Sequence, residues 1–477
     1  MSDSWSSLAL SVPVPKVDLG VHTDLFKVLW AKWGSLSSRN LTRSVYYDGE
    51  AALKDFGISI PPALTGVQAA LGWSAKGVHA VTDRSQFEGF VSPSGVEDPL
   101  AISGILDANR FGVEFKAASV SSAVHGVSFL TVSRGDVASG EPAVLVLPAS
   151  AEQSAGIWDA RRRRLTGFLT VRGSHSGGPE FATFYTDDLV YSLSRLSNGD
   201  WVWTSSPNVL GFVSVAPLVH KYELRRPLGH SRITKASMYY SDAALRTILR
   251  SEVSSEFYSA VEYWLFGADV SKFAGNDRWA AVMGRVKVMD VEQGDDKPEL
   301  HRFNGASPEP HIAQMRMWAN LFADDQDLEV KFADSANASS AEAIFAAKES
   351  LITTTRDANS LWRGGAEQAI QWAVMLRDGL REPSEELRSL RAQFTDPAIV
   401  SPSARADAFS KLAANVAGFG ESRVGLEYAG LSQEQITRFL AERRTSRVGS
   451  LVESLRGAGQ VARSDASVAA VVPALGD

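Results

Sequence analysis

The sequence contains no cysteine among its 477 residues, so disulfide bonds, cysteine-ligated metal sites and thiol catalysis are excluded. No apolar stretch approaches the roughly 18–20 residues that a membrane-spanning helix needs. Residues 1–30 lack a basic region followed by an apolar core and a cleavage site, which is the pattern of a secretory signal. These absences predict a soluble protein made in a cytoplasm, with no membrane partner.

The sequence also lacks the motifs of nucleotide and metal chemistry. There is no GxxxxGK[ST] phosphate loop, which argues against an ATP-driven motor. None of the eight histidines falls in an HxH or HExxH pattern, so a zinc site is not expected. Three acidic pairs, at 187–188, 295–296 and 324–325, have the chemistry to hold Mg²⁺, but solvated turns or helix ends explain them better. We predict no metal and no cofactor.

One short motif resembles a catalytic serine. LGHSRI at 228–233 is similar to the GxSxG nucleophile elbow, but Ile233 replaces the glycine that the sharp turn of the elbow requires. The hydroxyl of Ser231 is better explained as the N-cap of a helix. We therefore predict no catalytic residues and no enzymatic activity.

The charge of the chain argues against tight binding to nucleic acid over a wide surface. The formal net charge is -7 and the sequence pI is about 5.7, whereas strong duplex binding uses clustered Lys and Arg. Four arginines at 161–164 form the most conspicuous basic run. They lie between two apolar segments, which indicates the tip of a β-hairpin rather than a DNA contact.

The order of the predicted elements is α+β. A short amphipathic helix, Thr23–Trp33, precedes a turn at Tyr46–Gly49, and residues 141–222 have the alternation and turn residues of β-structure. A long helix at 230–266 follows, then a polar segment with its best strand at 284–291. Three further helix starts are marked by Ser307 with the prolines that follow it, and by two capping boxes, Ser339/Glu342 and Ser432/Gln435.

The predicted helix at 230–266 contains neither proline nor glycine. Its apolar residues recur at intervals of three and four, which places them on one helical face. A long amphipathic helix in mid-chain is typical of a strut or an assembly surface. The stripe consists of Leu245, Ile248, Leu249, Val253, Phe257, Val261 and Trp264.

Five collinear stretches, spanning about 300 residues, carry a family resemblance. They are YYDGE…GISIPP (46–62), ILDANRFGVEFKAA to HGVSFLTV (105–132), RPLGHSRITKA…DAALRTILRSEVSSEFYSA (226–260), SPEPHIAQMRMWANLFA (307–323) and ANASSAEAIFAAKESLI (336–352). In this order they resemble the portal proteins of tailed bacteriophages, particularly the Gp6-like portals of siphophages that infect actinobacteria. The departures are His230, where a basic or small polar residue is expected, and the acidic N-terminal side of the segment after 323.

The resemblance implies a portal fold with a wing, long stem helices, a small α/β clip and an α-helical crown. It divides the chain into a flexible arm (1–22), the wing (23–229, β-rich at 141–222), a stem helix (230–266), the clip (267–306), a second stem helix (307–325), a tunnel loop (326–339), a long wing–crown helix (340–380), the crown (381–456) and a flexible tail (457–477).

The resemblance further implies a homo-oligomeric ring of twelve subunits at one capsid vertex, assembled in the host cytoplasm and retained in the virion. Double-stranded DNA would pass through its channel during packaging and ejection. Its implied partners are the large terminase, a head–tail connector or adaptor protein, the major capsid protein and scaffold. Candidate DNA-channel residues are Lys331, Glu329, Asp334, Arg250 and Glu252, and candidate docking residues of the clip are Lys272, Arg278, Arg285 and Lys287.

Two alternatives stay open at this point. One is a phage-encoded serine hydrolase or maturation protease that uses Ser231 or an acidic pair. The other is an adaptor protein of the phage neck, which would not assemble into a portal ring.

Overall fold

The computed structural model of the protein contains helices and mainly antiparallel sheets, which confirms the α+β class. Its described residues form two compact units. The first contains those up to Phe87 and from Leu100 to Pro397, and the second those from Glu88 to Pro99 and from Ala398 onward. The residues described are 13–51, 70–93, 98–174, 178–258, 262–266, 286–289, 299–303, 307–328, 341–398, 402–432, 435–446 and 448–449.

The β-rich prediction for residues 141–222 is confirmed. Most of this region forms an antiparallel sheet of five strands in sequence order. The four-arginine run forms the turn between the first two strands, as predicted, and residues 196–200 turn between the last two. The strands are β4 (Ser154–Asp159), β5 (Arg164–Ser174), β6 (Gly178–Tyr185), β7 (Leu189–Arg195) and β8 (Trp201–Pro207).

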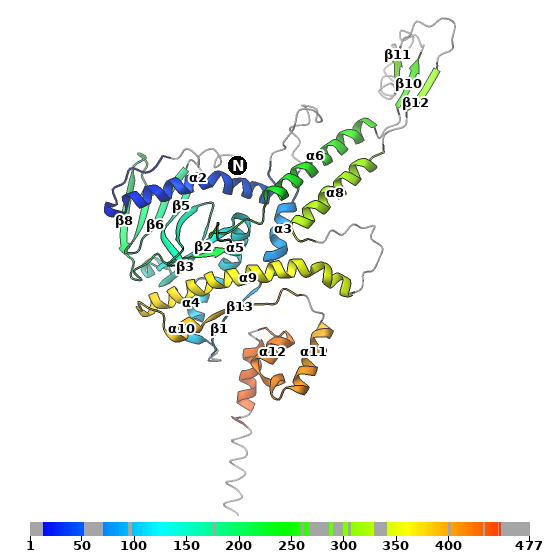
Figure 1. The fold of residues 1–477 in the computed structure, drawn as a ribbon. Helices are drawn as coiled ribbons and strands as arrows, with labels where there is room; N and C mark the ends of the chain where they lie inside the picture. Colours follow the sequence, from blue (N-terminus) through cyan, green and yellow to red (C-terminus); the bar gives the residue numbers. More distant parts are fainter. Residues whose placement is uncertain are drawn as a thin grey trace, which may run out of the picture. The chain divides into compact units, whose positions relative to one another are not determined.

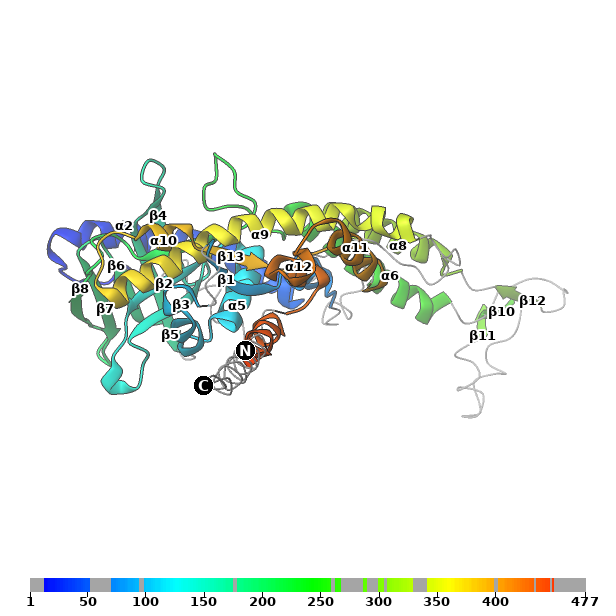
Figure 2. The same cartoon turned by 90° about the horizontal axis from the view of Figure 1, so that it is seen from below.

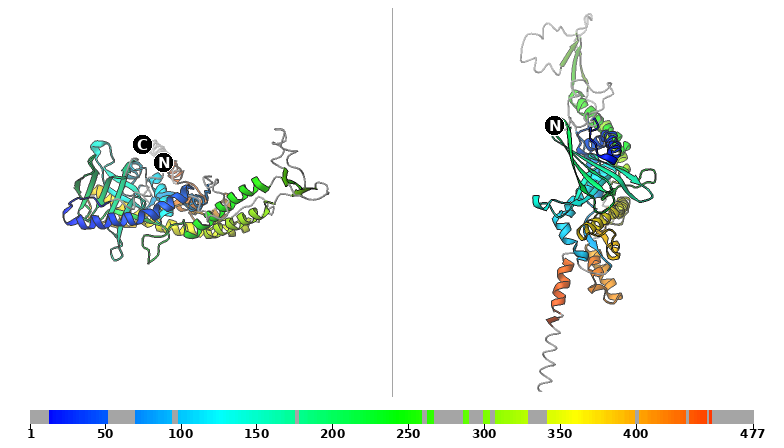
Figure 3. Two further views of the ribbon diagram at one scale, coloured as in Figure 1. Left: turned by 90° about the horizontal axis from the view of Figure 1, so that it is seen from above. Right: turned by 90° about the vertical axis from the view of Figure 1, so that its left-hand side faces the viewer.

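Helix α2 (Thr23–Asp48) lies along this sheet, after the 3-10 turn η1 (Gly20–His22) (Figure 3). Its buried aromatic residues Phe26, Trp30 and Trp33 pack against side chains of β5, β6 and β7. The predicted helix, Thr23–Trp33, was too short, because the second half of α2 buries polar residues, which breaks the apolar period. Asn40, for example, is 2% exposed and donates from Nδ2 to the carbonyl oxygen of Ala151 at 2.7 Å.

A three-stranded antiparallel sheet, in the order β3-β2-β9, forms the centre of the first unit. Helices α5 (Phe111–His125) and α9 (Ala341–Asp378) both contact it, and Figure 2 shows the length of α9. Gly365 permits the close approach of α9, since a Cβ there would lie 2.6 Å from the carbonyl oxygen of Pro217. The strands are β2 (Val127–Arg134), β3 (Val144–Ser150) and β9 (Val215–Val219).

Several other regular elements before residue 398 are short. Residues 99–111 do not form one continuous helix, because Leu100, Ala101 and Arg110 have positive φ angles. The pieces are the 3-10 turn η3 (Pro99–Ala101) and α4 (Ser103–Ala108). The remaining elements are α3 (Trp73–Thr82), β1 (Phe87–Val91), the 3-10 turn η4 (Val137–Ser139), α10 (Glu385–Ser389) and β13 (Arg391–Phe394).

Helices α6 (Lys235–Tyr258) and α8 (Glu309–Asp325) lie side by side (Figure 1). The prediction of one helix over 230–266 was wrong at both ends. Residues Glu262–Phe266, with the sequence EYWLF, form strand β10, as their aromatic content favours. Strand β10 pairs in parallel with β11 (Val286–Met289) and antiparallel with β12 (Glu299–Phe303), so Trp264 does not belong to the helical stripe.

The second unit is helical after residue 401. It contains α11 (Pro402–Asn415), the 3-10 turn η6 (Phe419–Glu421) and α12 (Arg423–Ala429). The predicted capping box is confirmed: Gln435 N–H donates to Ser432 Oγ at 3.3 Å, and Ser432 N–H donates to Gln435 Oε1 at 3.0 Å. Ser339, of the other predicted box, lies outside the described residues. No described helix is both long and apolar enough to span a bilayer.

Candidate functional site at the junction of α6, α8 and α9

The segment before α6 is held in place by backbone contacts. Gly229 has a φ of 73°, and a Cβ there would collide with the carbonyl oxygens of His220 and Gly126, so only glycine fits. His230 N–H donates to His220 O, and Arg232 N–H donates to Ala123 O, both at 2.8 Å. These contacts direct the Arg232 side chain into the space between three helices.

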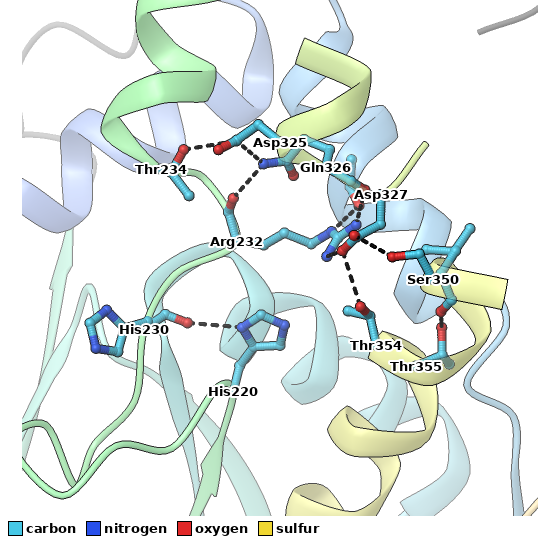
Figure 4. A network of polar contacts seen from close by, with 12 residues as sticks. His220, His230, Arg232, Thr234, Asp325, Gln326, Asp327, Ser350, Thr354 and Thr355 are labelled. Carbon is cyan, nitrogen blue, oxygen red and sulfur yellow. Dashed lines mark hydrogen bonds and ion pairs between the residues drawn. The ribbon is translucent and has the colours of Figure 1, made fainter. Parts of the chain in front are cut away.

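Arg232 is buried, with 1% of its surface exposed, and it contacts three parts of the chain (Figure 4). Its Nε donates to the carbonyl oxygen of Gly77 at 2.6 Å, and its Nη2 donates to that of Gln326. Its Nη1 lies 4.0 Å from Asp327 Oδ2. Burial lowers the pKa of Arg232, and the carboxylates of Asp327 and Asp325 oppose that effect.

Gln326 connects the start of α6 to the end of α8. Its side chain is almost fully buried, and Nε2 donates to Arg232 O at 3.0 Å and to Asp325 Oδ2 at 2.7 Å. Thr234 Oγ1 donates to the same Asp325 oxygen at 2.9 Å. Asp325 is therefore a structural hydrogen-bond acceptor at the end of α8.

Asp327 connects this junction to α9. It adopts a left-handed conformation, with φ at 51°. Its carboxylate accepts hydrogen bonds from Ser350 Oγ at 2.6 Å and from Thr354 Oγ1 at 3.0 Å (Figure 4). Residues on both sides of 329–340 are thus joined to each other through one carboxylate. We call these contacts of Arg232, Thr234, Asp325, Gln326, Asp327, Ser350 and Thr354 the junction network.

A buried histidine supports the segment that carries Arg232. His220 Nδ1 donates to His230 O at 2.8 Å. Burial, together with the nearby charge of Arg232, lowers the pKa of His220 to about 3. The ring is therefore neutral near pH 7, and it positions the backbone without adding a second positive charge beside Arg232.

Ser231 does not have the surroundings of a nucleophile. It is 5% exposed, its Oγ donates to the carbonyl oxygen of Val124, and it accepts from Ile233 N–H at 2.9 Å. The predicted N-cap role was wrong, since Thr234 Oγ1 accepts from Ser237 N–H at 2.9 Å at the start of α6. A hydroxyl that donates to a backbone carbonyl has no general base to activate it. Among the described residues no group of three or more potential metal ligands occurs.

The structure describes three of the nine predicted site residues. On α6, Glu252 is exposed and Arg250 is half-buried. The backbone of Lys287 lies in β11, opposite Trp264 of β10. The other candidates, Lys331, Glu329, Asp334, Lys272, Arg278 and Arg285, lie outside the described residues.

A groove between α6 and α8 is the second feature of this region. It encloses a cavity of about 470 Å³ whose walls are mainly apolar. Its rim exposes Ile312, at 40% of its surface. The groove is lined by Trp73, Thr247, Ile248, Ser251, Glu252, His311, Ile312, Met315, Arg316 and Ala319.

The family of phage portal proteins described as SPP1 Gp6-like matches residues 27–446. The chain belongs to this portal family. Two curated relatives are the portal proteins of Mycobacterium phages D29 and L5, each 26% identical over 424 residues, covering 85% of this chain and 86% of theirs. The portal fold is also similar to a solved chain from the neck of a native GTA particle computed with C12 symmetry. That match has a TM-score of 0.39 and 12% identity, and it covers 80% of this chain and 94% of the other.

Members of this portal family are structural proteins of the phage head, and the family's standard function is to conduct DNA. The portal resemblance seen in the sequence is therefore confirmed, and so is the function that it implied. Portal family membership also implies a ring oligomer at the portal vertex of the virion.

Proposed function

We propose that the portal ring contains twelve copies of this chain and assembles in the host cytoplasm with the major capsid protein and scaffold. The large terminase, and later a head–tail connector, dock on the clip through Lys272, Arg278, Arg285 and Lys287. The proposal is carried by the match to the portal family over residues 27–446. The protein acts as a conduit and has no catalytic residues of its own.

The groove between α6 and α8 is the surface through which neighbouring stems pack. Ile312 of α8 lines the groove and is 40% exposed. Met317 and Leu321, 45% and 39% exposed, lie roughly 140° and 180° further around the helix, so α8 has apolar side chains on two faces. Exposed apolar surface of this kind is generally covered by a partner. The neighbouring copy's stem helix, whose exposed face has the same apolar composition, is the occupant that a closed ring supplies.

The position of α6 in the ring also limits which of its residues face the DNA channel. Arg250 and Glu252 are two positions apart on α6, which separates them by about 200° around the helix axis, so only one of them faces the lumen. Glu252 is exposed and also lines the groove, so we place it where the groove meets the lumen; an acidic wall there limits sticking of the DNA backbone. Residues 326–339 form the tunnel loop, where Lys331 makes transient phosphate contacts flanked by Glu329 and Asp334.

The test is the assembly state of the purified full-length chain. We expect rings with a central channel in negative-stain images and a mass near twelve times 51.4 kDa. Ile312→Glu places a charge in the groove and should release subunits, whereas Val137→Glu, at a 65% exposed apolar residue outside both helices, should leave rings intact. A wild-type chain that stays monomeric at every concentration would favour the neck-adaptor alternative.

A further inference from the structure

A second cavity lies in the first unit, between α2, β4 and the segment that precedes α6. Its volume is about 440 Å³, which falls in the range of small-molecule pockets. Four cationic side chains line it. Lys32, Arg39 and Arg43 come from one face of α2, with Lys32 about two turns before Arg39 and Arg43 about one turn after it, and Arg226 comes from the segment before Gly229.

These four cations are not neutralised by the protein. Lys32 Nζ donates to Gly156 O at 2.9 Å, and Arg43 Nη1 donates to His125 O at 2.7 Å, so both contact neutral carbonyls. Arg226 Nη1 lies 3.3 Å from His230 Nδ1. Within the described part of the chain, no ion pair joins any of the four to a carboxylate.

The neighbouring carboxylate, Glu152, is engaged elsewhere. Its Oε2 accepts from Ser44 Oγ at 2.7 Å and lies 3.8 Å from His125 Nε2. The uncompensated charge is felt by the titratable groups of the cavity. Burial, followed by Arg39 and Arg226, lowers the pKa of Arg43 to about 10, and burial, followed by Arg43 and Arg39, lowers that of His125 to about 3.

Three buried polar atoms in the residues that line the cavity also lack a partner. They are Asn40 Oδ1, His125 Nδ1 and Ser154 Oγ, and each of these residues is at least nine-tenths buried. Buried polar groups in folded proteins are almost always hydrogen-bonded, so these atoms mark an incompletely paired polar region beside the cavity. Asn40 Oδ1 can only accept a hydrogen bond, so it is the four cations that favour a negatively charged ligand.

The opposite wall of the cavity is apolar. Val127 and Phe129 of β2 and Ile157 and Trp158 of β4 contribute to it. We propose that the cavity binds an oxyanion, a phosphate or carboxylate group, that is attached to an apolar body. Guanidinium groups bind such oxyanions in bidentate fashion, and the apolar wall covers the remainder of the ligand.

Two probes test the site on the full-length protein: inorganic phosphate and phenyl phosphate. Ionic strength is kept constant with chloride, so that general screening does not change. By isothermal titration calorimetry we expect one site per subunit, with phenyl phosphate bound at least tenfold more tightly because its ring meets the apolar wall. At ten times the dissociation constant, the ligand should raise the Tm by about 1–2 °C.

The decisive variant is the double replacement Arg39→Gln with Arg226→Gln. Both side chains are exposed, so the fold should tolerate the change, and phosphate affinity should fall at least tenfold. The matched control is Arg161→Gln with Arg163→Gln at the exposed hairpin tip, which removes the same charge away from the cavity and should leave affinity unchanged. Absence of saturable binding, or equal loss in both double variants, would overturn the proposal.

The same measurements distinguish two sources of the oxyanion. If a free metabolite supplies it, isolated subunits and assembled rings should bind phenyl phosphate equally. If an acidic side chain of a neighbouring copy supplies it, isolated subunits should bind the probe and rings should not. Either result supports an oxyanion site, and failure of both forms to bind contradicts it whether or not the chain forms rings.

Discussion

Replacing Arg232 by methionine should loosen the region where α6, α8 and α9 meet. Methionine retains much of the apolar stem of arginine but removes all of its donors. The carbonyl oxygens of Gly77 and Gln326 would each lose a charge-assisted hydrogen bond. Asp327 would lose its ion-pair partner at 4.0 Å, while it kept the two hydroxyl groups of α9.

The magnitude follows from these contacts. A hydrogen bond to a charged group contributes about 1.5–3 kcal/mol, and breaking a buried ion pair costs about 3–5 kcal/mol. The side chain of Asp327 is 26% exposed, so water replaces part of the lost attraction. Two lost hydrogen bonds, a weak ion pair and a small loss of packing together give about 3 kcal/mol.

Native-state hydrogen exchange measures this locally, without assuming two-state unfolding of the whole chain. The relevant amides are those of Gln326, which donates to Phe322 O at 3.1 Å, and Leu328, which donates to Ala323 O at 2.8 Å. A loss of about 3 kcal/mol corresponds to exchange about 100-fold faster in a peptide that covers both. Arg161→Met, at the exposed hairpin tip, is the control and should change nothing there.

Exchange that stays within a factor of three of wild type would refute the reasoning. It would mean that packing of α6 against α8, rather than the buried guanidinium, holds the end of α8. Equal acceleration in the Arg161→Met control would show that the effect is one of global charge and has no connection with the junction network.

Two further predictions concern packing and pH. Gly365→Ala should lower the free energy of unfolding by about 1–3 kcal/mol, because the new Cβ would lie 2.6 Å from Pro217 O. Gly364→Ala is the control: its Cβ would have nothing within 4 Å, so it should raise the free energy of unfolding by up to about 1 kcal/mol. The urea midpoints of the two variants measure the difference. The pKa of His220 is depressed to about 3, so the unfolded chain takes up its proton first as pH falls below about 6.5. The contribution of neutral His220 to stability is therefore complete above pH 6.5 and is lost towards pH 3 by about 1.4 kcal/mol per pH unit. Urea midpoints of His220→Asn should depend less on pH than those of wild type. An identical pH dependence would contradict the depressed pKa of His220.

The regular elements could be predicted where one rule dominates. Strands β4 to β8 alternate and are separated by turn residues, and the Ser432/Gln435 capping box is a local pattern that needs no tertiary contact. Helix α2 was predicted too short because Ser37 and Asn40 are buried by contacts with residues distant in sequence or with the backbone. A periodicity argument treats such residues as solvent-facing.

The limits of α6 were wrong for a related reason. Trp264 fits both a helical stripe and a buried strand, and the choice depends on whether β12 is present beside it. The burial of Arg232 could not be predicted from its neighbours in the sequence, because a single arginine in a non-periodic segment is usually exposed. Its role depends on Gly77 and Gln326, which are 155 and 94 residues away in sequence, so only the folded chain reveals the junction.

The junction network also determines how a displacement near the proposed channel is transmitted. Asp327 lies at the start of the proposed tunnel loop and is held by Ser350 and Thr354 of α9. Each of these hydrogen bonds, made to a carboxylate, contributes about 1.5–3 kcal/mol. A force that moves the chain near Asp327 must therefore break them or carry α9 along. Because α9 packs closely on β9 at Gly365, the second outcome would shift the central sheet of the first unit together with the helix. The carboxylate of Asp327 consequently couples movement of the loop to movement of the subunit body. Breaking its hydrogen bonds to Ser350 and Thr354 would let the loop move without α9.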